Sequence, residues 1–182
     1  LPVDLQIPGC PPSPAQLLPS GPAYPFANAR NMVIALAQRA RKRLVLVTPY
    51  FVPGEAAMMA LTSAALGGLD VRLMVPKMSD SRLVTLAARS YYDDLLAAGV
   101  KIYEYGPRML HTKALLVDDA SAIMGSANFD HRSFRLNFEV SVLFQDRDLG
   151  ARLAKLIEGE FASAPRVRTD RQRPLLGTRL PE

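Results

Sequence analysis

The fold and the chemistry of this chain both follow from one stretch, residues 111–118, which runs His111-Thr112-Lys113-Ala114-Leu115-Leu116-Val117-Asp118. An apolar run stands in its second half, with ionisable side chains at both ends. Residues two apart share one face of a strand, so His111 and Lys113 are predicted to point to the same side. A histidine attacks phosphorus or hands a proton to a departing alkoxide, and a lysine beside it neutralises phosphate oxygens. The stretch therefore predicts phosphoryl chemistry at the entry to a strand.

Two polar segments downstream supply what such a site still needs. Ser126 and Asn128 are again two residues apart, and they can donate a hydroxyl and an amide to the same phosphate oxygens. Gly125 just before them permits a close approach of the backbone. Further on, the carboxylate of Glu139 can accept the proton of the far imidazole nitrogen of His111. That contact would fix the tautomer of the ring and stabilise its charged form.

The residues on either side of this region predict an α/β fold with a mixed β-sheet flanked by helices. Helices are predicted at residues 28–42, 55–66, 79–98 and 147–162, and strands at 44–47, 71–75, 100–103, 113–118, 122–125 and 138–144. Asn28 is the predicted cap of the first helix, and Ser79 or Asp80 that of the third. The first three strands alternate with helices, which predicts crossover connections and parallel pairing. The last three follow one another without full helices, so the sheet is mixed.

The composition of the chain favours polyanionic partners but does not identify which kind. The chain is 49% apolar and has a net charge of +5 with a pI near 9.6. A basic balance suggests nucleic acid, an anionic membrane surface or a phosphate-bearing substrate, although a soluble domain with a basic tail fits as well. No apolar run is long enough to span a bilayer. Since the chain begins with Leu and not Met, we expect it to be part of something larger, with any membrane anchor outside it.

The pattern His-x-Lys-x4-Asp, followed by Gly-Ser-x-Asn and a later Glu, resembles the signature of the phospholipase D superfamily. The resemblance implies catalytic roles for His111, Lys113, Asp118 and Glu139, and phosphate-binding roles for Lys113, Ser126 and Asn128. Asp118 holds the third place of the motif. Because a carboxylate at a strand end is better suited to holding a loop or pairing with a base, we interpret Asp118 as structural and not as a reacting group.

Other segments are similar, more narrowly, to the second half of bacterial cardiolipin synthase. The similarity extends over roughly residues 17–165, and it is carried by residues 19–22, 48–53, 91–105 and 128–133. It implies a phospholipase D-like half-domain. The chain is accordingly divided into a Pro-rich linker at 1–25, a catalytic half-domain at 26–164 and a basic flexible tail at 165–182.

One motif makes half of a site in this family. The resemblance implies two motifs facing each other, of which one histidine forms a phosphohistidine and the other moves protons. This chain has two histidines, and His131 is followed by Arg132-Ser133, so it cannot begin a second motif. The partner is therefore an N-terminal half with its own motif, or a second copy in a homodimer. By similarity to second halves, His111 is interpreted as the acid/base and not the nucleophile.

The resemblance implies a phosphatidyltransferase like cardiolipin synthase, acting without metal or cofactor on a phosphatidylglycerol-like lipid. Its expected location is the bacterial inner membrane, at the cytoplasmic face or peripherally, on an anionic surface; the fragment itself is expected to be soluble and inactive. Two alternatives stay open: a single-motif, homodimeric nuclease of the phospholipase D type, and an inactive half-domain. The segments Tyr-Phe-Val-Pro at 50–53 and Gly-Val-Lys-Ile-Tyr at 99–103 argue against nucleic acid as the partner.

Overall fold

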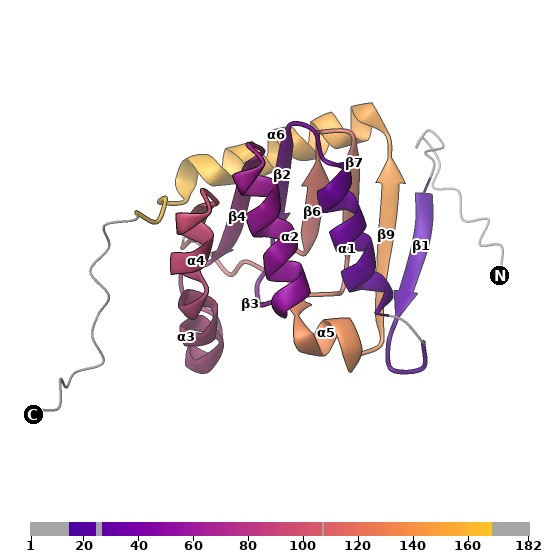
Figure 1. Ribbon diagram of the computed structural model, residues 1–182, viewed down its shortest axis with the longest axis horizontal. Helices are drawn as coiled ribbons and strands as arrows, with labels where there is room; N and C mark the ends of the chain where they lie inside the picture. Colours follow the sequence, from indigo (N-terminus) through magenta and orange to yellow (C-terminus); the bar gives the residue numbers. More distant parts are fainter. Residues whose placement is uncertain (1–14, 25–26, 107, 169–182) are drawn as a thin grey trace, which may run out of the picture.

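The structure of the protein, a computed structural model, describes residues 15–24, 27–106 and 108–168. Within these ranges the chain forms a seven-stranded sheet, a two-stranded sheet and helices on both sides of the larger sheet (Figure 1). The strands are β1 (Ala15–Ser20), β2 (Arg43–Val47), β3 (Phe51–Val52), β4 (Asp70–Pro76), β5 (Lys101–Tyr105), β6 (Ala114–Val117), β7 (Ser121–Gly125), β8 (Phe129–Asp130) and β9 (Glu139–Gln145). The helices are α1 (Asn28–Arg39), α2 (Glu55–Leu66), α3 (Arg82–Ser90), α4 (Tyr92–Ala97), α5 (His131–Arg135) and α6 (Arg147–Ser163). The predicted mixed α/β class is confirmed.

The order of the strands in the larger sheet is β1-β9-β7-β6-β2-β4-β5. Strands β2, β4 and β5 are parallel, as predicted from their alternation with helices, and the other neighbours are antiparallel. It follows that β2, β4, β5 and β7 end at one edge of the sheet, where β6 and β9 begin. We call this the lower edge, after its position in Figure 1, and the opposite one the upper edge.

Strand β2 lies at the centre and explains the continuous apolar run at 44–47. Leu44 and Leu46 belong to the core beneath α1 and α2, whereas Val45 and Val47 belong to a second core beneath α6. All four side chains are buried, which is typical of a strand covered on both faces. Each such side chain contributes roughly 1.5–3 kcal/mol of burial free energy. The centre of the sheet is thus its most firmly held part.

The prediction of an unpacked linker over residues 1–25 is wrong for residues 15–20. These residues form the edge strand β1, which pairs with β9 along its whole length, and Leu18 and Ser20 are buried. Pro19 lies opposite Val140, and an edge strand tolerates proline because one side needs no backbone donor. Residues 1–14 lie outside the described residues.

Two predicted helix starts also differ from the structure. Asn28 is the first residue of α1 and not its cap, because its side-chain amide donates to the carbonyl oxygen of Pro19 at 3.0 Å. The single helix predicted at 79–98 is divided into α3 and α4 at Tyr91, and Ser81 caps α3. Its second part turns so that Tyr92 is buried in the core.

The predicted basic tail begins with residues that pair with the sheet. Pro165 accepts a hydrogen bond from the backbone of Glu104, and Val167 donates one to Ile102, so this segment lies along β5. Residues 169–182 lie outside the described residues. Among the described helices, none is both long and apolar enough to cross a bilayer.

Candidate active site

The lower edge collects most of the predicted site residues. His111 and Lys113 stand directly before β6, Ser126 and Asn128 directly after β7, and Glu139 opens β9. The three strands are neighbours in the sheet, which brings these five residues of distant segments to one place. Within the described ranges, no three His, Cys, Asp or Glu side chains form a cluster able to hold a metal ion.

His111 and Lys113 contact each other directly. The lysine Nζ lies 3.1 Å from Nδ1 of His111 and donates to its carbonyl oxygen at 2.9 Å. A charged lysine has only donors, so Nδ1 is the acceptor and a neutral ring carries its proton on Nε2. Burial lowers the pKa of Lys113, although the charge of Glu139 opposes this. Lys113 thus stands in a partly dry setting, where a positive charge acts more strongly on a phosphate than it does in water.

Glu139 is bound differently from the prediction. Its carboxylate accepts hydrogen bonds from Ser126, from Ser133 at 2.9 Å and from the side-chain amide of Asn137 at 3.2 Å. Among the described residues it makes no hydrogen bond to His111, whose Nδ1 contacts Lys113. In this chain Glu139 organises the Ser126 hydroxyl and not the histidine.

Ser133 is a site residue for which the sequence predicted no role. Its side chain is fully buried and joins three elements of the site. The hydroxyl donates to Glu139 and accepts from the backbone N–H of Asn128 at 3.0 Å, while its own N–H donates to Asp130 at 2.7 Å. The last bond caps α5, so the spacing Asp-x-x-Ser was the available signal.

The amide of Asn128 points into the protein near Lys113. Its Oδ1 is buried and has no hydrogen-bond partner among the described residues. Asn128 and Lys113 also line one small cavity, of about 40 Å³. A buried amide oxygen without a partner is costly, and rotating the amide exchanges its oxygen and its N–H₂ group. The side chain is thus available to a polar ligand.

Gly125 is required by the close passage of β9. A Cβ at this position would overlap the carbonyl oxygen of Val140 and the Cα of Ser141. Ser126 bonds the backbone of the same Val140 twice: the Ser126 N–H donates to the Val140 carbonyl at 2.9 Å, and the Ser126 hydroxyl accepts from the Val140 N–H at 3.0 Å. The absence of a side chain at Gly125 therefore sets the position of Ser126.

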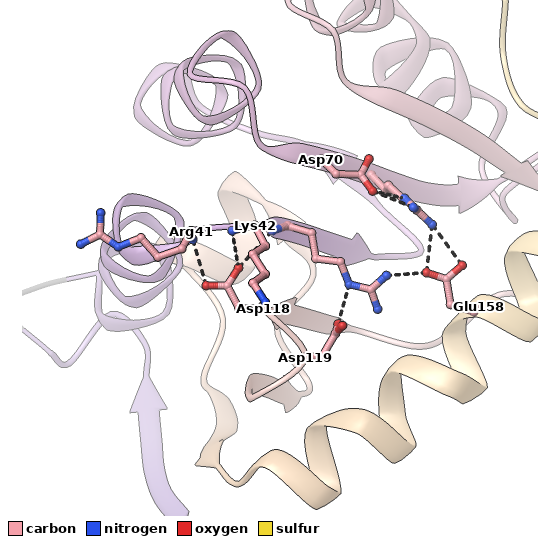
Figure 2. A network of polar contacts seen from close by, with 8 residues as sticks. Arg41, Lys42, Asp70, Asp118, Asp119 and Glu158 are labelled. Atoms are coloured by element: carbon pink, nitrogen blue, oxygen red, sulfur yellow. Dashed lines mark hydrogen bonds and ion pairs between the residues drawn. The ribbon is translucent and has the colours of Figure 1, made fainter.

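Asp118 lies at the upper edge, at the opposite end of β6 from His111 and Lys113. Its carboxylate accepts backbone N–H bonds from Arg41, Lys42 and Arg43 at 2.8–3.0 Å (Figure 2). Burial opposes ionisation, but these three bonds outweigh it and hold the pKa of Asp118 below its ordinary value. The structure does not bring this carboxylate to the lower-edge cluster.

An ion-pair network continues from there along the upper edge (Figure 2). Asp119 and Glu158 both bind Arg43, and Glu158 also binds Arg72. Arg72 and Lys101 share Asp70 in turn. The network joins α6 to β2 and β4, and it is separate from the candidate site.

A larger cavity adjoins His111 on the α6 side of the sheet. It measures about 490 Å³. Most of its lining is apolar, and the lining residues are Val47, Met74, Tyr105, Arg108, Met109, Leu110, His111, Thr112, Met124, Leu153, Leu156, Ile157 and Glu160. Volumes of roughly 300–1,000 Å³ with apolar walls are typical of small-molecule sites. An apolar chain fits beside the histidine here.

Comparison with known proteins places the chain among phospholipase D-like proteins. The family model described as "Cardiolipin synthase, PLD-like domain" matches residues 33–164. "Cardiolipin synthase 2" of Bacillus anthracis is 41% identical over 156 residues, which cover 86% of this chain and 30% of that protein. "Cardiolipin synthase" of a Geobacillus strain is 42% identical over 162 residues, covering 88% of this chain and 32% of the other. The chain thus spans about a third of the length of these relatives.

The fold agrees with these matches. The crystal structure of the phospholipase D family member Nuc from Salmonella typhimurium superposes with a TM-score of 0.73 at 20% identity, covering 86% of this chain and 99% of the other.

Proposed function

Because this chain belongs to the family of cardiolipin synthase, phospholipase D-like domains, we propose that it supplies one half of the active site of a phosphatidyltransferase. A phosphatidyl group passes from a phosphatidylglycerol-like lipid to an alcohol on a second lipid. The observation that carries this proposal is the meeting of His111 and Lys113 at the lower edge beside an apolar cavity. His111 and Lys113 suit the phosphate, and the cavity suits the lipid part of the substrate.

In this mechanism a histidine from each of two motifs takes part. One attacks phosphorus and forms a phosphohistidine, while the other protonates the departing alcohol. The second histidine then removes the proton from the incoming alcohol as it attacks the phosphohistidine. We assign the acid/base role to His111. Lys113 balances the charge on the phosphate oxygens, and Asn128 offers its amide to them.

Ser126 and Glu139 act as a pair in this proposal. The single hydroxyl proton of Ser126 is engaged by Glu139, so the hydroxyl has a fixed direction before substrate binds. When substrate binds, a phosphate oxygen replaces the carboxylate as the acceptor of the hydrogen bond from Ser126. Asp118 has no part in the chemistry and holds the other end of β6.

The second motif comes from another half, either an N-terminal one or that of a second copy. We propose that it packs on the α6 side of the sheet, beside β9 and β1. Phe138, Val140 and Leu17 are 73%, 48% and 63% exposed there, next to Ser126. Contiguous exposed apolar side chains mark surfaces that a partner covers. The same side of the sheet contains the cavity beside His111.

The test compares the two histidines of this chain in the protein that contains both motifs. His111→Ala is expected to lower transfer of a labelled phosphatidyl group between vesicle lipids by about 10²–10⁴-fold, the usual worth of acid/base help. His131→Ala, at the start of α5, is the matched control and is expected to retain activity. Substantial activity in His111→Ala would refute the proposal.

The alternative functions make different predictions for the isolated chain. A monomer without transfer activity in sedimentation and vesicle assays is expected, because half of the chemical groups are missing. A stable dimer that cleaves DNA without metal would favour a homodimeric nuclease.

A further inference from the structure

Tyr50 and Asp80 form a hydrogen-bonded pair at the lower edge that the proposed chemistry does not use. Tyr50 follows β2 and Asp80 follows β4, so both stand just after the carboxyl ends of neighbouring parallel strands. The phenolic oxygen lies 2.7 Å from each carboxylate oxygen. In α/β sheets this is the place where ligands bind.

The pair shares a small cavity with His111. This cavity measures about 20 Å³, and Pro49, Pro76 and Met109 also line it. A cavity of this size holds a single water-sized group, for which roughly 10–15 Å³ suffices. A hydroxyl group fits here.

The polar groups of the pair are suited to a hydroxyl donor. The carboxylate of Asp80 has only acceptors, and the Tyr50 oxygen keeps lone pairs after donating its proton to Asp80. A ligand must therefore donate. The hydrogen bond with Asp80 raises the pKa of Tyr50, as do burial and the charges of Asp80 and Asp130. The surroundings of Tyr50 are thus negative, opposite in sign to those that Lys113 provides.

We propose that Tyr50 and Asp80 recognise the alcohol at the His111 site, by binding a second hydroxyl of a polyol headgroup while another hydroxyl reacts at phosphorus. This inference rests on the proposed function and adds its alcohol specificity. Phosphate binds toward Lys113, and a neutral polyol such as glycerol binds toward the acidic pair. An alcohol that carries a further negative charge beside its hydroxyls is disfavoured, because Asp80 and Asp130 repel it. A site built to bond a hydroxyl discriminates strongly against analogues that lack it.

The test measures transfer to two alcohols that differ only in hydroxyl number, glycerol and 1-propanol. The protein contains both motifs and acts on vesicles with a labelled phosphatidylglycerol donor. Tyr50→Phe and Asp80→Asn are each expected to lower the preference for glycerol, measured as the ratio of kcat/KM values, by about ten-fold or more, since a hydrogen bond to a charged group is lost. The kcat/KM for 1-propanol itself is expected to stay unchanged, because this alcohol has no second hydroxyl for the pair to bind. Asp94→Asn removes an exposed carboxylate of α4 and is the matched control.

The outcomes separate the two levels of inference. An unchanged preference in both variants, or an equal loss with both alcohols, would overturn the alcohol site while transfer by the wild type upholds the proposed function. A wild type that transfers the phosphatidyl group to a second lipid but to neither soluble alcohol would overturn the alcohol site alone. A wild type that transfers it to none of these acceptors would overturn the proposed function and the alcohol site with it. Tyr50→Phe keeps the ring, and an unchanged melting temperature shows that it folds. If Asp80→Asn does not fold, the result for Tyr50→Phe alone decides the test.

Discussion

Replacing Asp118 by Asn tests whether the third residue of the motif braces the fold or reacts. The residue has a φ of 52°, in the left-handed region, which asparagine tolerates better than most residues. The substitution therefore adds no backbone strain. It removes the negative charge and exchanges one carboxylate oxygen for an N–H₂ group.

The expected cost follows from the hydrogen bonds. Oδ1 accepts from Lys42 and Arg43, and Oδ2 accepts from Arg41. Asparagine keeps one oxygen, so at least one bond is lost and the others become bonds to a neutral acceptor. Bonds to charged groups contribute roughly 1.5–3 kcal/mol and neutral ones about 1 kcal/mol. Because the donors of Arg41 and Lys42 are near water, we expect a loss of about 2 kcal/mol.

The assay is denaturant unfolding at several pH values. The folded-state pKa of Asp118 is depressed, so its stabilisation is complete above the unfolded value of about 3.9 and is lost as the pH falls through the folded value. The difference between wild type and Asp118→Asn should be largest near neutral pH and vanish in acid. Asp94→Asn, an exposed change of the same kind, is expected to stay within about 0.5 kcal/mol of the wild type.

Activity measurements complete the test. If Asp118 is a brace, the folded fraction of Asp118→Asn transfers phosphatidyl groups at the wild-type rate. A variant as stable as the wild type but inactive would refute the structural interpretation, and a difference in stability that persists in strong acid would refute its electrostatic origin.

Three other predictions follow from the geometry. Gly125→Ala is expected to cost about 1–3 kcal/mol, because the new Cβ overlaps the backbone of Val140, and a variant with unchanged unfolding would contradict this. Lys113 has a pKa lowered by burial, against the charge of Glu139, so transfer should fall in alkali at a pH below the ordinary lysine value of about 10.4; Lys113→Arg should move that fall upward in a pH–rate profile, and an unmoved fall would refute the assignment. Glu158→Gln weakens two part-exposed ion pairs, with Arg43 and Arg72, and should cost at most about 1 kcal/mol for each, a cost that disappears near 1 M salt.

Local sequence patterns were sufficient to predict the buried strand at the centre of the sheet and the contact between His111 and Lys113. The run at 44–47 is apolar at every position because both faces are covered, and this is visible without a structure. The pairing of His111 with Lys113 follows from their spacing alone. Whether all the predicted residues react stays a prediction that the experiments above address.

Contacts between distant segments explain what the sequence did not reveal. Strand β1 is held by its pairing with β9, more than a hundred residues away, and its Pro-rich surroundings favoured a linker. Glu139 accepts from Ser133 and Ser126 and not from His111, and spacing alone cannot rank several donors that lie within reach of one carboxylate. Tyr50 and Asp80 meet across 30 residues because two parallel strands end side by side.

The spacing of the motif has a simple origin in the length of β6. The four residues between Lys113 and Asp118 are the strand itself, Ala114–Val117, and they span about 13 Å at the usual rise per residue. Leu115 packs into one core and Leu116 into the other, so one inserted residue would exchange the faces of these side chains. It would also separate Asp118 from its three backbone donors. The length of β6 along the strand axis therefore sets the number of residues in the motif. The chemistry constrains only the lower-edge end of β6, where His111 and Lys113 lie. Asp118 at the other end fixes the position of the strand along its axis.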